Sequence, residues 1–203
     1  MNSCIPLISV FFIGFLMCFA GCSNATTESN TSQAALPVLC QPVLSPAQPY
    51  DPVSPAYKAL VSGFSFLNNE AYDSALTAYR LAIKMDTTDP AGYYGVAFTY
   101  TQLGEPLEAI YYYSKVIQLD STYRKAYYNR AYEAMGQQQY LDAKKDLDRA
   151  IQLDPYDPDA YLNRGICKYS MGDEPGACKD WNRICAKLRE DIIDVYYKES
   201  CTK

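Results

Sequence analysis

The stretch Tyr127-Tyr128-Asn129-Arg130-Ala131 returns, one constant step along the chain, as Tyr161-Leu162-Asn163-Arg164-Gly165. The same step of 34 positions relates other parts of the sequence. Three columns share this register: the alanines Ala75, Ala109, Ala143 and Ala177; the small residues Gly63, Ala97, Ala131 and Gly165; and the bulky residues Tyr79, Tyr113, Leu147 and Trp181. A constant period of this length indicates a repeat array in which each period forms one structural unit.

Within each period the apolar side chains follow helical spacing. Between residues 71 and 85 they recur at intervals of three and four, as Tyr72, Ala75, Leu76, Tyr79, Ala82 and Ile83. This spacing places them on one face of an α-helix, and it recurs in residues 107–117 and 140–151. Small residues are needed where two helices cross closely. We therefore expect Gly63 to touch Ala75, and Gly165 to touch Ala177.

The two stretches quoted first, together with Ala150-Ile151-Gln152-Leu153-Asp154-Pro155, resemble tetratricopeptide repeats over about residues 55–190. The resemblance implies an all-α fold, a right-handed superhelix of four helix pairs with a C-terminal capping helix. It places the repeat domain at residues 55–203, with repeats at about 56–89, 90–123, 124–157 and 158–191 and the cap reaching residue 203.

Local signals mark where the helices begin and end. Ser54-Pro55, Asp89-Pro90 and Asp157-Pro158 each combine an N-cap residue with proline in the first helical turn. Gly104 marks the inner turn of the second repeat, and in the third repeat the turn glycine is displaced to Gly136. Helical spacing continues almost to the C-terminus, where polar residues supply the outer face that a terminal element needs: Asp191, Asp194, Lys198 and Glu199.

The N-terminal segment has the pattern of an export signal. Residues 1–27 contain no charged side chain, and residues 5–20 form an apolar run of signal-peptide length. The run ends in Phe19-Ala20-Gly21-Cys22, which resembles the lipobox of bacterial lipoproteins, although Phe19 stands where that family prefers leucine. The resemblance implies removal of residues 1–21 and acylation of Cys22. An uncleaved N-terminal transmembrane anchor and ordinary signal cleavage remain alternatives.

Residues 22–54 are rich in Pro, Ser and Thr, and six prolines lie between Pro37 and Pro55. Such a composition is typical of a disordered tether, with a reach of about 30 Å or more. We therefore predict a membrane-anchored lipoprotein of the bacterial cell envelope, periplasmic or surface-facing, whose repeats stand clear of the bilayer.

Composition disfavours several classes of function. The net charge is −5 and no basic stripe is present, so nucleic acid is not expected as a partner. Histidine is absent, which removes the commonest general base and metal ligand. We see no nucleophile–base constellation and no phosphate loop, and we expect carboxylates such as Asp146 and Asp148 on a solvated helix face. We predict neither enzymatic activity nor a cofactor.

The family pattern lines the concave face with one side of each first helix. The corresponding positions are Tyr57, Leu60, Phe64, Leu67, Ala91, Tyr94, Phe98, Thr101, Lys125, Tyr128, Tyr132, Met135, Leu162, Ile166 and Tyr169. This lining is aromatic and nearly uncharged, which favours a groove for an apolar or amphipathic segment. Packing between neighbouring rings is the alternative.

Two features of relatives bear on the kind of partner. Some relatives clamp acidic C-terminal tails, but Leu60 and Phe64 stand at the first clamp positions, so this activity is not expected. The pairs Asn129-Arg130 and Asn163-Arg164 either bind a partner or, as in many repeats, make local contacts.

Four cysteines gather near the C-terminus: Cys167, Cys178, Cys185 and Cys201. In an exported protein they predict a disulfide, for which we expect Cys201 to pair with Cys167 or Cys178. Zinc is the rival interpretation, but neither a CxxC motif nor histidine supports it.

The leading hypothesis is a membrane-tethered, envelope-facing scaffold that binds a peptide or protein partner in its groove during assembly of another complex. Its membrane contact is the N-terminal lipid. The alternative is a glycan- or peptidoglycan-binding module that uses exposed tyrosines.

Overall fold

The computed structural model describes residues 54–184 and residue 201. This part of the chain contains eight α-helices and no strand. The predicted signal peptide, Cys22, the tether and the polar cap beyond residue 184 lie outside the described residues, Cys201 excepted.

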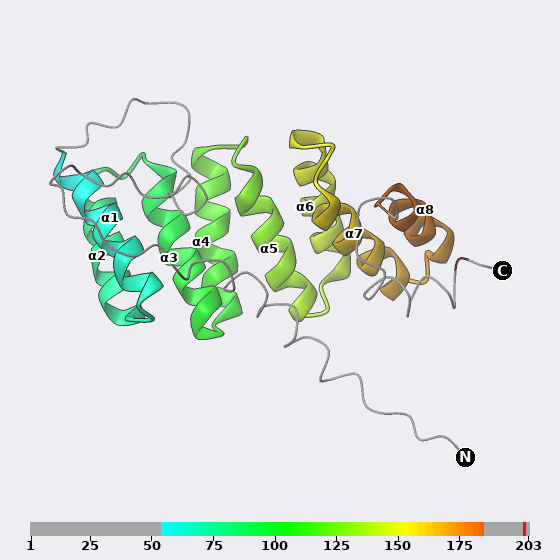
Figure 1. Cartoon of the computed structure of the whole chain (residues 1–203), viewed down its shortest axis with the longest axis horizontal. Helices are drawn as coiled ribbons and strands as arrows, with labels where there is room; N and C mark the ends of the chain where they lie inside the picture. Colours follow the sequence, from blue (N-terminus) through cyan, green and yellow to red (C-terminus); the bar gives the residue numbers. More distant parts are fainter. Residues whose placement is uncertain (1–53, 185–200, 202–203) are drawn as a thin grey trace, which may run out of the picture. The chain divides into compact units, whose positions relative to one another are not determined.

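The helices form four antiparallel pairs that follow one another in chain order (Figure 1). The pairs are α1 (Pro55–Asn68) with α2 (Tyr72–Met85), α3 (Pro90–Leu103) with α4 (Pro106–Leu119), α5 (Arg124–Gly136) with α6 (Tyr140–Leu153), and α7 (Pro158–Ser170) with α8 (Glu174–Ile184). Each second helix also packs on the first helix of the next pair. The predicted all-α repeat architecture is confirmed.

Aspartate and serine side chains set the helix boundaries. Ser54 Oγ accepts a hydrogen bond from the Tyr57 N–H at 3.1 Å, and Asp89 and Asp157 cap α3 and α7 in the same way. The proline that follows each cap occupies the first helical turn, where its missing N–H costs nothing.

Each inner turn contains one residue in the left-handed conformation. The four residues are 34 positions apart: Glu70 (φ 58°), Gly104 (φ 73°), Gln138 (φ 61°) and Gly172 (φ 83°). The prediction that Gly136 serves as the turn glycine of the third repeat is wrong, because Gly136 is the last residue of α5. Register along the repeat, and not the residue type, decides which residue makes the turn.

The small column of the first helices faces the bulky column of the second helices. A Cβ atom added to Gly63 would lie 2.7 Å from the Tyr79 ring, and one added to Gly165 would lie 2.1 Å from Trp181 Nε1. The atoms nearest to each added Cβ are therefore ring atoms in the middle of the second helix. At these two pairs the ring enters the interface because the facing position of the first helix has no side chain. The expected contacts of Gly63 with Ala75 and of Gly165 with Ala177 stay predictions.

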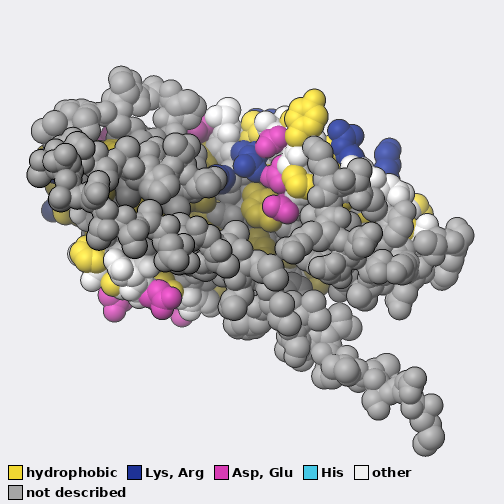
Figure 2. Space-filling model, viewed as in Figure 1, with side chains coloured by type: hydrophobic (Ala, Val, Ile, Leu, Met, Phe, Trp, Pro, Cys, Tyr) yellow, Lys and Arg dark blue, Asp and Glu magenta, His cyan; other side chains and the backbone are white. Residues whose placement is uncertain are grey.

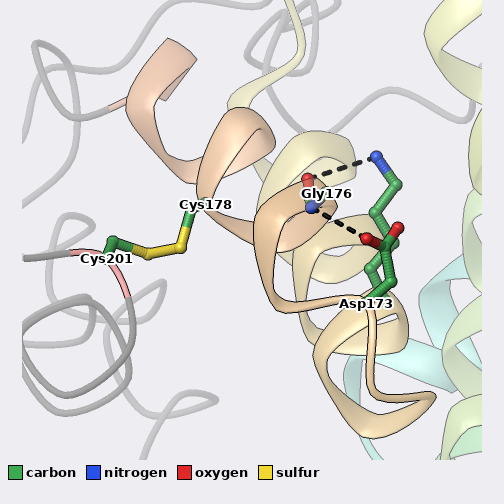
Figure 3. Close-up of a disulfide and its surroundings, with 5 residues drawn as sticks. Asp173, Gly176, Cys178 and Cys201 are labelled. Carbon is green, nitrogen blue, oxygen red and sulfur yellow. Dashed lines mark hydrogen bonds between the residues drawn. A yellow bond between two sulfur atoms is a disulfide. The ribbon is translucent and has the colours of Figure 1, made fainter. Parts of the chain in front are cut away.

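A disulfide joins α8 to the C-terminal segment, between Cys178 and Cys201 (Figure 3). Their Cα atoms are 5.5 Å apart, and the bond closes a loop across 23 positions of sequence. Of the two pairings that the sequence left open, the structure has this one, and Cys167 is free and fully buried. Closing a loop of this length stabilises a fold by about 3 kcal/mol.

Near the disulfide, backbone polar groups of the first turn of α8 are satisfied by side chains. The Gly176 N–H donates to Asp173 Oδ1 at 2.9 Å, and Lys168 Nζ donates to the Gly176 carbonyl at 3.3 Å (Figure 3).

Among the helices described, none has the length and apolar character needed to span a membrane.

The facing columns predict a size-dependent coupling between Gly165 and Trp181. Gly165→Ala should lower the free energy of unfolding by about 1–3 kcal/mol, because the new methyl group overlaps the indole. The loss should be smaller in a Trp181→Leu background, since that pair reproduces Ala131 and Leu147 of the preceding repeat. Urea unfolding of the four proteins in this cycle measures the coupling.

Gly136→Ala is the matched control, because nothing lies within 4 Å of a Cβ atom added there and alanine favours the helix. Equal stabilities of the Gly165→Ala and Gly136→Ala variants would contradict the packing account.

Candidate functional site

The first helices of the repeats lie side by side and form one surface. Helix α1 contacts α3, and α5 contacts α7. Hydrogen bonds join them across repeats: Asn129 Nδ2 donates to the Tyr94 hydroxyl at 2.9 Å, and Asn163 Nδ2 donates to the Tyr128 hydroxyl at 3.0 Å. We call the side of α1, α3, α5 and α7 that carries the predicted groove residues the first-helix surface.

The predicted groove residues differ in exposure. Tyr132 is 43% exposed, and Lys125 is also exposed. Leu60, Ala91 and Met135 are buried, so they belong to the packed interior and offer little surface to a partner. The remaining positions are half-buried: Tyr57, Phe64, Leu67, Tyr94, Phe98, Thr101, Tyr128, Leu162, Ile166 and Tyr169.

Tyr94 packs tightly between repeats. Its ring centroid lies 6.3 Å from that of Phe98, 5.8 Å from that of Tyr113 and 5.1 Å from that of Tyr123. Burial raises the pKa of Tyr94 to about 12. The ring and its hydroxyl thus join α3 to α4 and α5, which is the packing role that the sequence left open for groove tyrosines.

Tyr128 has the same place one repeat later. Burial, assisted by the negative charges of Asp159 and Asp157, raises the pKa of the Tyr128 hydroxyl to about 12. The two asparagines that donate to Tyr94 and Tyr128 therefore make structural contacts between repeats, which is the local bonding that the sequence left open as one alternative.

The arginines that follow these asparagines are also used internally. Arg130 donates to both carboxylate oxygens of Asp146 at 2.7 and 2.6 Å and to Ser114 Oγ at 2.9 Å. Arg164 donates in the same way to Asp180 at 2.8 and 2.6 Å, and to Asp148 at 2.7 Å. Each guanidinium ties its own repeat to the second helix of the preceding one.

The carboxylates of these pairs lie in the interior. Asp146 and Asp180 are 8% and 3% exposed, so the expectation that Asp146 lies on a solvated face is wrong. A carboxylate can be buried there because a bidentate guanidinium compensates its loss of hydration. The sequence did contain a signal for this burial, which is a constant spacing. Each arginine precedes its aspartate by the same number of positions that separates a small residue of a first helix from the bulky residue facing it on the second helix.

Glu133 is a polar group of the first-helix surface that the sequence analysis missed. Its Oε1 accepts a hydrogen bond from Thr101 Oγ1 at 2.6 Å, and burial raises the pKa of its carboxyl. No lysine or arginine of the described residues forms an ion pair with it. A partner that brings a cation to this point would compensate the desolvated carboxylate.

Two depressions open on the surface at positions that include none of the predicted groove residues. One, of about 660 Å³, lies on α1 and α2, and the other, of about 510 Å³, lies among α2, α3 and α4. Figure 2 shows one face, on which hydrophobic side chains lie at the surface beside acidic and basic ones. Within residues 54–184 and 201, no cluster of Cys, Asp or Glu side chains could hold a metal ion.

Comparisons with known proteins agree on the repeats. Models of the tetratricopeptide repeat family match residues 90–123 and 128–187. A crystal structure of MamA protein is 25% identical with a TM-score of 0.64, and the match covers 70% of this chain and 81% of that one. No curated protein sequence matches this chain.

Two further solved structures share the fold. The first TPR of Spaghetti (RPAP3), bound to the HSP90 peptide SRMEEVD, is 23% identical with a TM-score of 0.56, and the match covers 58% of this chain and 93% of that one. Pseudomonas aeruginosa pilF is 21% identical with a TM-score of 0.61, and the match covers 71% and 68%. At these identities the likeness is one of fold.

The raised pKa of Glu133 predicts a pH-dependent effect of Glu133→Gln. In the folded state burial disfavours the ionised form, so the carboxylate lowers stability at neutral pH and this cost disappears as pH falls through the folded pKa. Glu133→Gln keeps the acceptor for Thr101 and should raise Tm at pH 7, whereas near pH 3.5 the two proteins should have equal Tm. Glu108→Gln, on the exposed side of α4, controls for the loss of one surface charge. A gain in Tm that is constant from pH 3.5 to 8 would contradict the assignment.

Proposed function

We propose that the chain, whose residues 90–123 and 128–187 match models of the tetratricopeptide repeat family, is a membrane-tethered, envelope-facing scaffold that binds a peptide or protein partner. The partner would lie along the first-helix surface. Its capture would serve the assembly of another complex.

The observation that carries this proposal is the continuity of the first-helix surface. Hydrogen bonds from Asn129, Asn163 and Thr101 hold neighbouring first helices in a fixed relation, so a ligand meets a preformed surface. Rigid aromatic side chains on such a surface bury large areas at a small entropic cost. The peptide-bound structure of Spaghetti, which shares the fold, supports a peptide as the class of ligand. The repeats and this complex both favour a protein partner, so we do not propose the glycan alternative.

Individual residues of the surface would have different roles. Tyr132 is exposed and Phe98 is half-buried, so both have area to offer a partner. Glu133 lies next to Tyr132 in the sequence and lacks a cationic partner among the described residues. Together they favour a segment that combines apolar side chains with a lysine, an arginine or a free amino group.

The proposed location has two supports. Residues 5–20 and Cys22 follow the pattern of a lipoprotein signal, and several acyl chains on one residue would give stable membrane attachment. The disulfide between Cys178 and Cys201 is compatible with export, because disulfides persist in oxidising compartments.

Partner capture should depend on Tyr132. Tyr132→Ala removes an exposed ring and should leave the circular dichroism spectrum and Tm nearly unchanged while reducing the yield of cross-linked partner at least fivefold. The measurement is cross-linking in native membranes followed by quantitative mass spectrometry. Tyr156→Ala is the matched control, because Tyr156 is 79% exposed and lies in the turn between α6 and α7. The same partner yield from both variants would remove the first-helix surface as the binding site.

Membrane attachment should depend on Cys22. Cys22→Ser should move the full chain from the membrane fraction to the aqueous fraction, and the acylated N-terminal peptide should disappear from the mass spectrum. Cys40→Ser, in the same N-terminal segment, should leave both unchanged. Membrane retention of the Cys22→Ser chain would refute the lipid anchor while leaving the binding proposal intact.

A further inference from the structure

The junction between the first two repeats lacks the ion pairs of the later junctions. In those, Arg130 joins Ser114 to Asp146, and Arg164 joins Asp148 to Asp180. One repeat earlier, the positions equivalent to Arg130, Asp146 and Ser114 hold Val96, Tyr112 and Arg80. At the first junction the guanidinium is therefore that of Arg80 on α2, and none of the three positions holds a carboxylate.

The depression of about 510 Å³ among α2, α3 and α4 lies at this junction. Its lining includes the cations Arg80 and Lys115 and the rings of Tyr93, Tyr111 and Tyr112, and it contains no acidic residue. Tyr111 is 56% exposed, and Leu119 at the edge is 43% exposed. The site therefore presents apolar and aromatic area together with two positive charges.

Neither cation is neutralised within residues 54–184. Arg80 Nη2 donates to the Tyr100 hydroxyl at 2.8 Å, and Lys115 Nζ lies 5.5 Å from the centroid of the Tyr111 ring and 3.4 Å from Gln118 Oε1. No described carboxylate forms an ion pair with either side chain.

The equivalent surface of the third repeat is different. There Asp146 replaces Tyr112 and pairs with Arg130, and Lys145 replaces Tyr111 and pairs with Asp142. Arg149, at the position of Lys115, donates to Gln152 and to the Ser121 carbonyl and has no carboxylate partner among the described residues. Two uncompensated cations at one depression stand out on a chain whose net charge is −5. This local contrast selects for a ligand of negative charge.

We propose that this depression binds an acidic peptide segment that carries an aromatic or large aliphatic side chain. Carboxylates of the segment pair with Arg80 and Lys115, of which the guanidinium offers the geometry for bidentate binding. The apolar side chain lies against Tyr111 and Tyr112, where ring contacts add to its burial. Apart from Tyr93 of α3, the lining comes from the second helices α2 and α4, and it includes none of the predicted groove residues. The scaffold can therefore hold two segments at once.

Fluorescence anisotropy with the full chain in detergent tests the proposal. The probe is a fluorescein-labelled peptide Glu-Asp-Phe-Glu-Asp-Leu, and the comparison peptide is Gln-Asn-Phe-Gln-Asn-Leu. The acidic probe should bind at least tenfold more tightly than the neutral peptide, and its affinity should fall as salt rises from 50 to 200 mM. Equal affinities of the two peptides, or no binding of the acidic probe, would overturn the proposal.

Matched variants locate the binding. Lys115→Glu should weaken binding of the acidic probe at least tenfold, and Tyr111→Ala should weaken it about fivefold. Arg149→Glu makes the same charge change at the equivalent position of the next repeat, on α6, and should change the affinity less than twofold. Circular dichroism and Tm check that each variant is folded.

Three results would count against this site. Equal losses in Lys115→Glu and Arg149→Glu would mean attraction by charge alone. A loss in Tyr132→Ala as large as that in Tyr111→Ala would place the probe on the first-helix surface. Self-association of the parent chain that Lys115→Glu abolishes, with no binding of the probe, would identify a second copy as the occupant.

Discussion

The structure depends on one steric constraint, which is that each bulky side chain in the middle of a second helix needs a small residue, glycine or alanine, opposite it on the first helix. Tyr79 lies over Gly63, and Trp181 lies over Gly165, whose added Cβ atoms would overlap the rings. The indole gains a further contact because its Nε1 donates to the Leu162 carbonyl at 3.2 Å. Close approach of the backbones buries the apolar stripe of each helix, which no pair could bury alone, and neighbouring pairs then complete the core.

Repetition gives each position the same surroundings several times, so the residues that differ between repeats show what each junction uses. Arg130 and Arg164 connect second helices through buried carboxylates. At the first junction Val96 stands at the equivalent position, and aromatic contacts connect the helices instead. There Tyr112 stacks with Tyr100, their centroids 5.7 Å apart, and Arg80 donates to the Tyr100 hydroxyl. At both kinds of junction the second helix packs on the next first helix, but the charge left at the surface differs.

The sequence predicts the fold because the period, the helical spacing and the Asp-Pro boundaries are local and repeat in register. It predicts the surface less well. The side chains of Tyr94 and Tyr128 bond to asparagines of the following repeat, so their use in packing depends on how neighbouring repeats stack. The burial of Asp146 depends on Arg130 in the same way. The left-handed turn at Gln138 escapes prediction because no glycine marks it.

The charge of the first junction follows from what that junction lacks. A carboxylate at the position of Tyr112 would pair with a neighbouring guanidinium and withdraw it from solvent, as Asp146 does with Arg130. With tyrosine there, Arg80 keeps its charge at the surface, since a hydroxyl partner does not neutralise it. An aromatic ring therefore does two things at this position: it replaces the ion pair as the packing contact, and it leaves a cation available to an incoming acid.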